Sequence, residues 1–75
     1  MNKNLDVLRK YLGLKKKEFH YLLIDNEIID LYGKPLVNFI RRETKYIESN
    51  SGISRKTNYF TSDLGINVLK SKLDM

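Results

Sequence analysis

Cysteine is absent from this chain of 75 residues. Without thiols the chain can form neither a disulfide framework nor a thiolate metal site, and this composition suits a reducing compartment. Its single histidine, His20, has no neighbouring residues that would complete a metal-ligand set. We therefore expect His20 to be a surface or partly packed residue, and we expect neither a metal nor a cofactor.

Long apolar runs are also missing. No segment approaches the roughly 20 apolar residues needed to span a bilayer. The start, Met1 to Asn4, lacks the apolar core of a signal peptide. We therefore expect a cytoplasmic protein that makes no use of a membrane.

Patterns that carry catalysis are lacking as well. One histidine has no serine and aspartate in a recognisable triad pattern, and the four glycines form no phosphate-cradling loop. Acidic residues are scattered and form no pair in an expected cleft. A chain this short also has difficulty enclosing a pocket that excludes water. We expect the protein not to be an enzyme.

Positive charge, by contrast, is in excess. Fourteen Lys and Arg residues against nine Asp and Glu residues give a net charge of +5 and a pI near 9.6. That balance is typical of proteins that bind a polyanion such as nucleic acid, and less often of proteins that bind an acidic partner protein. The length allows one small domain, which we assign to residues 1–75.

The N-terminal third predicts two helices joined by a very short turn. Asn4 is placed to cap the first, in which Leu5, Leu8 and Leu12 form an apolar face, and Gly13 ends it. The second is expected over residues 15–25, with its apolar side chains facing inward. Its other face and its start carry five polar or cationic residues: Lys15, Lys16, Lys17, His20 and Tyr21.

The remainder predicts two further helices with a hairpin between them. Pro35 can open a third helix over residues 36–44, which brings Arg41, Arg42 and Lys45 to its C-terminal end. Residues 45–50 and 56–62 have the composition of two strands around a loop at residues 49–52, with Arg55 and Lys56 near the tip. A last helix over residues 63–73 is expected to bury Leu64, Val68 and Leu69.

This order of elements predicts an α+β fold of the winged helix-turn-helix class, with about four short helices and a two-stranded β-hairpin wing between the third and the last helix. Residues 8–14, Glu18-Phe19 and Leu22-Leu23 resemble the helix, glycine turn and helix of a helix-turn-helix. Residues 61–69 resemble the strand-to-helix corner that closes many winged-helix domains. With Gly33-Lys34-Pro35 between them, these segments are similar to the C-terminal, KilA-C type domain of phage antirepressors. The resemblance implies a regulator from a phage or another mobile element.

The predicted function is sequence-specific or structure-specific DNA binding, as a small transcriptional regulator or accessory factor. Duplex DNA is favoured and single-stranded DNA stays open, as does the choice between the second and third helix for the groove. The candidate DNA-binding residues are Lys15, Lys16, Lys17, His20, Tyr21, Arg41, Arg42, Lys45, Arg55 and Lys56.

Each of these residues also has an ordinary structural interpretation. Lysines 15–17 can form a solvated helix start, and Arg41 and Arg42 can pair with nearby acids. The five tyrosines can stack on bases or simply fill the core and its rim.

The alternative function is a protein-binding inhibitor or antirepressor-like module that occupies a host or phage protein. An apolar surplus could serve such a partner or a homodimer, and it comprises Ile24, Ile28, Ile29, Leu31 and Tyr32.

Overall fold

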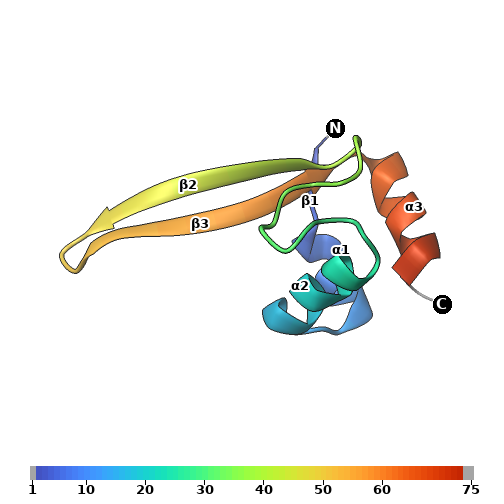
Figure 1. Cartoon of the computed structure of the whole chain (residues 1–75), viewed down its shortest axis with the longest axis horizontal. Coiled ribbons are helices and arrows are strands. Elements are labelled where there is room, and N and C mark those ends of the chain that lie inside the picture. Colours follow the sequence, from blue (N-terminus) through green and yellow to red (C-terminus); the bar gives the residue numbers. More distant parts are fainter. Residues whose placement is uncertain (1, 74–75) are drawn as a thin grey trace.

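The computed structural model describes residues 2–73 and has an α+β architecture in which the helices gather at one end (Figure 1). The elements follow in the order β1 (Lys3–Asn4), α1 (Asp6–Leu12), α2 (Lys16–Asp25), β2 (Arg41–Ser49), β3 (Gly52–Thr61) and α3 (Asp63–Leu73). The three strands form one antiparallel sheet in the order β1-β3-β2. The hairpin of β2 and β3 extends along the longest axis of the molecule, which measures 43 Å.

Helix α1 ends at Gly13 as its sequence predicts, but its N-cap residue is Leu5, and the predicted cap, Asn4, lies one residue earlier. The Asn4 side chain accepts a hydrogen bond from the amide of Asp6 at 2.9 Å, which satisfies one of the free donors at the start of the helix. Gly13 ends the helix with a φ of 70°, a left-handed conformation that suits glycine. The expected short glycine turn therefore joins α1 to α2.

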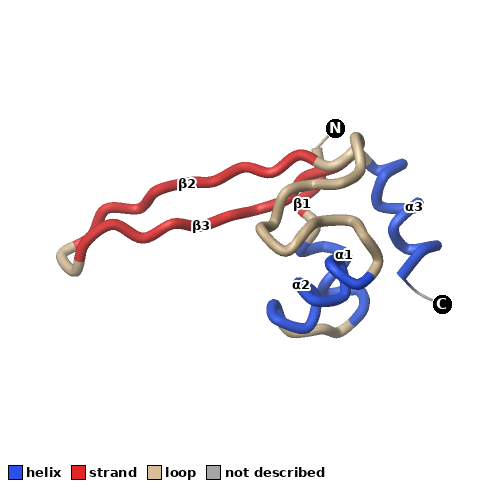
Figure 2. The backbone as a smooth tube through the Cα atoms, viewed as in Figure 1, coloured by secondary structure: helices blue, strands red, loops and turns tan. Residues whose placement is uncertain are grey.

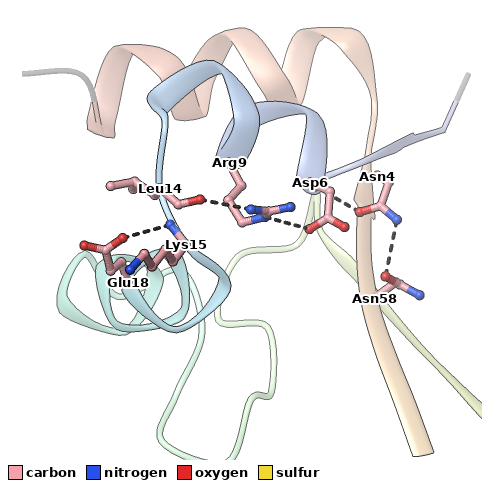
Figure 3. A network of polar contacts seen from close by, with 7 residues as sticks. All are labelled: Asn4, Asp6, Arg9, Leu14, Lys15, Glu18 and Asn58. Atoms are coloured by element: carbon pink, nitrogen blue, oxygen red, sulfur yellow. Dashed lines mark hydrogen bonds and ion pairs between the residues drawn. The ribbon is translucent and has the colours of Figure 1, made fainter.

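Polar contacts across this turn fix where α2 starts (Figure 3). The Arg9 guanidinium donates to the carbonyl oxygen of Leu14 at 2.9 Å and pairs with the Asp6 carboxylate at 3.4 Å. The amide of Lys15 donates to the Glu18 carboxylate at 2.8 Å. These contacts fix the position of the first turn of α2 relative to α1.

The apolar core lies among the three helices and the segment that follows α2. Nine hydrophobic side chains are buried there: Leu5, Leu8, Phe19, Leu23, Ile28, Ile29, Ile40, Ile66 and Leu69. Two of the five residues assigned to a partner surface, Ile28 and Ile29, are thus core residues with 0% and 1% exposure. They cannot contact a partner, whereas Leu31 and Tyr32 lie at the surface.

The prediction of a third helix over residues 36–44 is wrong. Residues 26–40 contain no helix, and β2 begins at Arg41 (Figure 2). Pro35 forms an isolated bridge with Ile29 and so lies in extended chain instead of opening a helix. Residues 41–44 pair with residues 57–60 of β3, so long-range strand pairing, and not a local helix, satisfies their backbone groups. The described chain therefore has three helices, and the hairpin is longer than predicted.

Helix α3 has the predicted bounds but turns a different face inward. Ile66 and Leu69 are buried, whereas Leu64 is 73% exposed and Val68 is also exposed. Gly65, which lies beside Ile66, is buried as well. Thr61 at the end of β3 and Phe39 in the segment before β2 leave no room for a side chain at Gly65, so the face of α3 that carries this glycine lies against them. Leu64 and Val68 were therefore wrongly assigned to the core, and Leu69 was assigned correctly.

The outer part of the hairpin is a two-stranded ribbon with no cover. We call residues 44–57 the ribbon; every one of them is exposed. Asn50 and Ser51 form the turn, and the register runs without interruption from Ser49 opposite Gly52 to Arg41 opposite Phe60. A hairpin that lacks a packed face is only marginally stable in water, so burial of a hydrophobic face does not account for the length of this one.

Candidate nucleic-acid interface

Four of the five site residues predicted in and before α2 lie on the exposed face of this helix. Lys16 and His20 lie one turn apart, as do Lys17 and Tyr21, so the four side chains share one face. All four are exposed, while Phe19 on the opposite face is buried. The helical period thus presents two lysines, an imidazole and a phenol on one surface.

This face of α2 borders a hollow against β3. The α2 hollow has a volume of about 440 Å³ and is lined by residues of β1, α1, α2 and β3 and by Leu5. Five predicted DNA-binding residues are among those that line it: Lys16, Lys17, His20, Tyr21 and Lys56. Residues that are 35 or more positions apart in the sequence therefore meet around one concave surface.

A second hollow lies next to it, on one face of the ribbon. The ribbon hollow has a volume of about 480 Å³ and extends from β2 and β3 to the loop that carries Tyr32 and Gly33. Arg42, Arg55 and His20 from the predicted set line it. His20 lines both hollows, so the two form adjoining parts of one surface.

Three predicted site residues, Lys15, Arg41 and Lys45, line neither hollow. The Arg41 guanidinium pairs with the Glu43 carboxylate at 2.6 Å, so the acidic partner considered for it is present. Lys45 lies directly opposite Lys56 in the ribbon. Because like charges at opposed positions repel, this pair weakens the hairpin unless an anion binds beside it.

Few of these cations are neutralised within the protein. In the described part of the chain, the ion pairs are Lys3 with Asp63, Arg9 with Asp6, and Arg41 with Glu43. Lys16, Lys17, Arg55 and Lys56 belong to none of them. Asp6 is the one carboxylate among the described residues that line the α2 hollow, and Arg9 already pairs with it. The surface around the two hollows is therefore positive.

Thr44, Thr57 and Asn58 also line the hollows but are not among the residues predicted from the sequence. The signal available for Thr44 was the alternation of β2, because Arg42, Thr44 and Tyr46 occupy every second position and so share a face. The prediction of a helix over residues 36–44 concealed that alternation.

Tyr59, which lines both hollows, connects β3 to the loop that contains Gly33 through a hydrogen bond. Its hydroxyl donates to the carbonyl oxygen of Gly33 at 2.7 Å. Burial raises the pKa of the Tyr59 phenol above its ordinary value, although the nearby Arg42 guanidinium opposes that rise. The phenol therefore stays protonated and keeps donating throughout the neutral range.

Replacement of Tyr59 by phenylalanine is expected to lower the free energy of unfolding by about 1 kcal/mol at neutral pH, because the Gly33 carbonyl loses its donor. A raised pKa in the folded state means that the stabilisation is complete below the unfolded pKa near 10. It is lost as the pH rises through the higher, folded pKa. Urea unfolding at pH 7 and pH 10.5 should therefore show a smaller difference between the two proteins at the higher pH. An equal difference at both pH values would contradict the assignment.

The other tyrosines divide between structural and open positions. The Tyr11 ring lies under the Lys70 ammonium, 4.3 Å from its centroid, at a distance suited to a cation–π contact. Tyr46 and Tyr32 both line the ribbon hollow and are exposed. Tyr11, although 59% exposed, thus contacts a cation of the protein itself, while Tyr32 and Tyr46 keep their rings open to solvent.

Comparison with models of known protein families, with curated proteins and with solved structures found no match to this chain. Among residues 2–73, no helix has the length and apolar character needed to cross a bilayer. Within the same residues, no three His, Asp or Glu side chains gather as a metal site would require.

Proposed function

We propose that this protein is a DNA-binding module of the winged helix-turn-helix class. The observation that carries the proposal is the convergence of cations from α2 and β3 on the two adjoining hollows, in a region where few of them have acidic partners. Positive side chains that lack internal partners are those that neutralise phosphates and release counterions.

The shapes of the two elements suit a duplex. Helix α2 has ten residues and is about 15 Å long, and a helix of that size fits the major groove of B-DNA. A two-stranded ribbon fits the same groove or follows the neighbouring backbone. We infer that α2 enters the groove and that Arg55 and Lys56 of β3 contact the adjacent phosphates.

The wider role is a further part of the proposal. A DNA-binding module of this size can act by occupying its site, as a transcriptional regulator or an accessory factor. The likeness of its helix-turn-helix and corner segments to KilA-C type domains supports a phage or mobile-element context.

A protein-binding role has one specific observation in its favour. Leu31 and Tyr32 are 81% and 91% exposed at the edge of the ribbon hollow. Two neighbouring large apolar side chains in solvent are typical of a contact surface, for a second copy or for another protein. Such a contact would be far less sensitive to salt than phosphate binding.

The salt dependence of binding tests the proposal. We expect the affinity for a labelled duplex, measured by fluorescence anisotropy, to fall at least tenfold between about 50 and 200 mM salt, as neutralisation of several phosphates requires. The variant Arg55→Glu/Lys56→Glu should bind more weakly and show a shallower salt slope. Its matched control is Lys10→Glu/Lys72→Glu, which changes the net charge equally at exposed positions outside both hollows.

Two results would count against DNA. One is the absence of binding at low salt, and the other is an affinity that salt leaves unchanged. An equal loss in the control variant would show that net charge, and not this surface, governs binding.

A further inference from the structure

The residues of the ribbon hollow alternate in a regular way. Three cross-strand pairs share this face of the hairpin: Arg42 with Tyr59, Thr44 with Thr57, and Tyr46 with Arg55. Each outer pair joins a guanidinium to a phenol, and the two threonine hydroxyls lie 3.4 Å apart between them. The face thus repeats a cation, a hydroxyl and an aromatic ring along each strand.

The electrostatics of this hollow favour a phosphate. No carboxylate is among the described residues that line it. One Arg42 nitrogen donates to the carbonyl oxygen of Tyr32 at 3.2 Å, which fixes the guanidinium while its other donors remain available. Arg55 forms no ion pair within the described chain. Two guanidinium groups in reach of one cavity suit the several oxygen acceptors of a phosphate group.

The aromatic rings favour a planar base. Tyr46 is 70% exposed, although a ring on a strand normally gains stability by packing. An exposed ring beside cations is the arrangement on which bases of unpaired nucleic acid stack, at about 1–3 kcal/mol per base. Stacked neighbours cover both faces of a base inside a duplex, so an intact duplex cannot offer that surface to Tyr46. The volume of about 480 Å³ falls within the range of small-ligand sites.

We propose that the ribbon hollow binds one unpaired nucleotide of a nucleic-acid strand, with the base stacked on Tyr46 and the phosphate held by Arg42 and Arg55. This inference rests on the proposed function and names the form of DNA that the site prefers: a bulge, gap or single-stranded end. The α2 hollow then contacts the adjoining duplex.

The test compares a labelled duplex with the same duplex carrying one unpaired thymidine. We expect the wild-type protein to bind the bulged DNA about tenfold more tightly, which corresponds to one stacked base. Tyr46→Ala should remove this preference, while Tyr46→Phe, which keeps the ring, should retain it. The matched control is Ile47→Ala, because Ile47 is the next residue of the ribbon, faces the opposite side and is also exposed. It should retain the preference too.

The outcomes separate the two proposals. If the perfect duplex binds with the expected salt dependence but the bulge adds nothing, the unpaired-nucleotide site is overturned and the DNA-binding proposal stands. The same conclusion follows if Tyr46→Ala weakens both forms equally. If neither form binds at low salt, both proposals fail.

Competition by thymidine 5′-monophosphate distinguishes a strand from a free nucleotide. Displacement of the bulged DNA only at millimolar nucleotide supports a strand, because most of the affinity then comes from the attached duplex. Displacement at the concentration of the DNA itself would overturn the assignment to a strand.

Discussion

Replacement of Lys16 and Lys17 by glutamate in one protein is expected to lower the affinity for duplex DNA by roughly 100-fold at low salt. The double change reverses two positive charges on the exposed face of α2, beside the α2 hollow. Loss of two phosphate contacts should also reduce the slope of log affinity against log salt by about 2. Anisotropy titrations at three salt concentrations measure both quantities.

The result should reflect binding and not unfolding. Both lysines lie in the first turn of α2, where the helix dipole disfavours cations and favours carboxylates by a few tenths of a kcal/mol each. The variant should therefore be at least as stable as the wild-type protein. Lys10→Glu/Lys72→Glu serves again as the control of equal net charge, and a comparable loss of affinity there would contradict a specific role for α2.

Replacement of Gly65 by alanine is expected to lower the free energy of unfolding by about 3 kcal/mol, a large part of the stability of a domain this small. A Cβ atom at this position would overlap the Thr61 hydroxyl and would lie 3.2 Å from the Phe39 ring. Thr61 is buried and donates to the carbonyl oxygen of Phe39 at 2.7 Å, so it cannot move aside without leaving that acceptor unpaired.

A double-mutant cycle measures this overlap directly. In a Thr61→Ala background the hydroxyl is gone, and the cost of Gly65→Ala should fall to about 1 kcal/mol. Asn67→Ala, at an exposed position of the same helix, is the matched control and should change stability little, because alanine is the better helix former. Equal costs of Gly65→Ala in both backgrounds would show that α3 does not pack against Thr61 as described.

The parts of the fold that local chemistry determines could be predicted from the sequence. Gly13 ends α1 through its left-handed φ, and the Asn4 side chain accepts from the Asp6 amide beside the start of the helix; both effects depend on neighbouring residues. The bounds of α3 follow from Asp63 and the helical period in the same way. Strand β1 spans only Lys3–Asn4 and forms because β3 pairs with it. No local sequence pattern predicts a strand of this kind.

The segment from Leu36 to Thr44 shows why the rest could not be predicted. Its apolar residues and the preceding proline fit a helix start, but Ile40 is buried at the entrance to β2 and the arginines that follow belong to a long hairpin. Pairing between residues distant in sequence decided the outcome. Likewise, no sequence pattern shows that Thr61 lies against Gly65, which sets the rotation of α3.

Only part of the candidate site could likewise be predicted from the sequence. The helical period alone places Lys16, Lys17, His20 and Tyr21 on one face. Lys56 borders the same hollow because β3 lies beside α2. Only the tertiary structure reveals that arrangement.

The uncovered ribbon also affects how copies of this protein can associate with each other. Along residues 44–57 each strand has one neighbour only, so its outward amide and carbonyl groups are a template on which a strand from another molecule could add. Lys45, Arg55 and Lys56 lie on these strands, and we expect repulsion between their charges to disfavour the pairing of two ribbons. The charges of Arg55 and Lys56, which we assign to DNA binding, are thus expected also to disfavour fibrous self-assembly of the free protein.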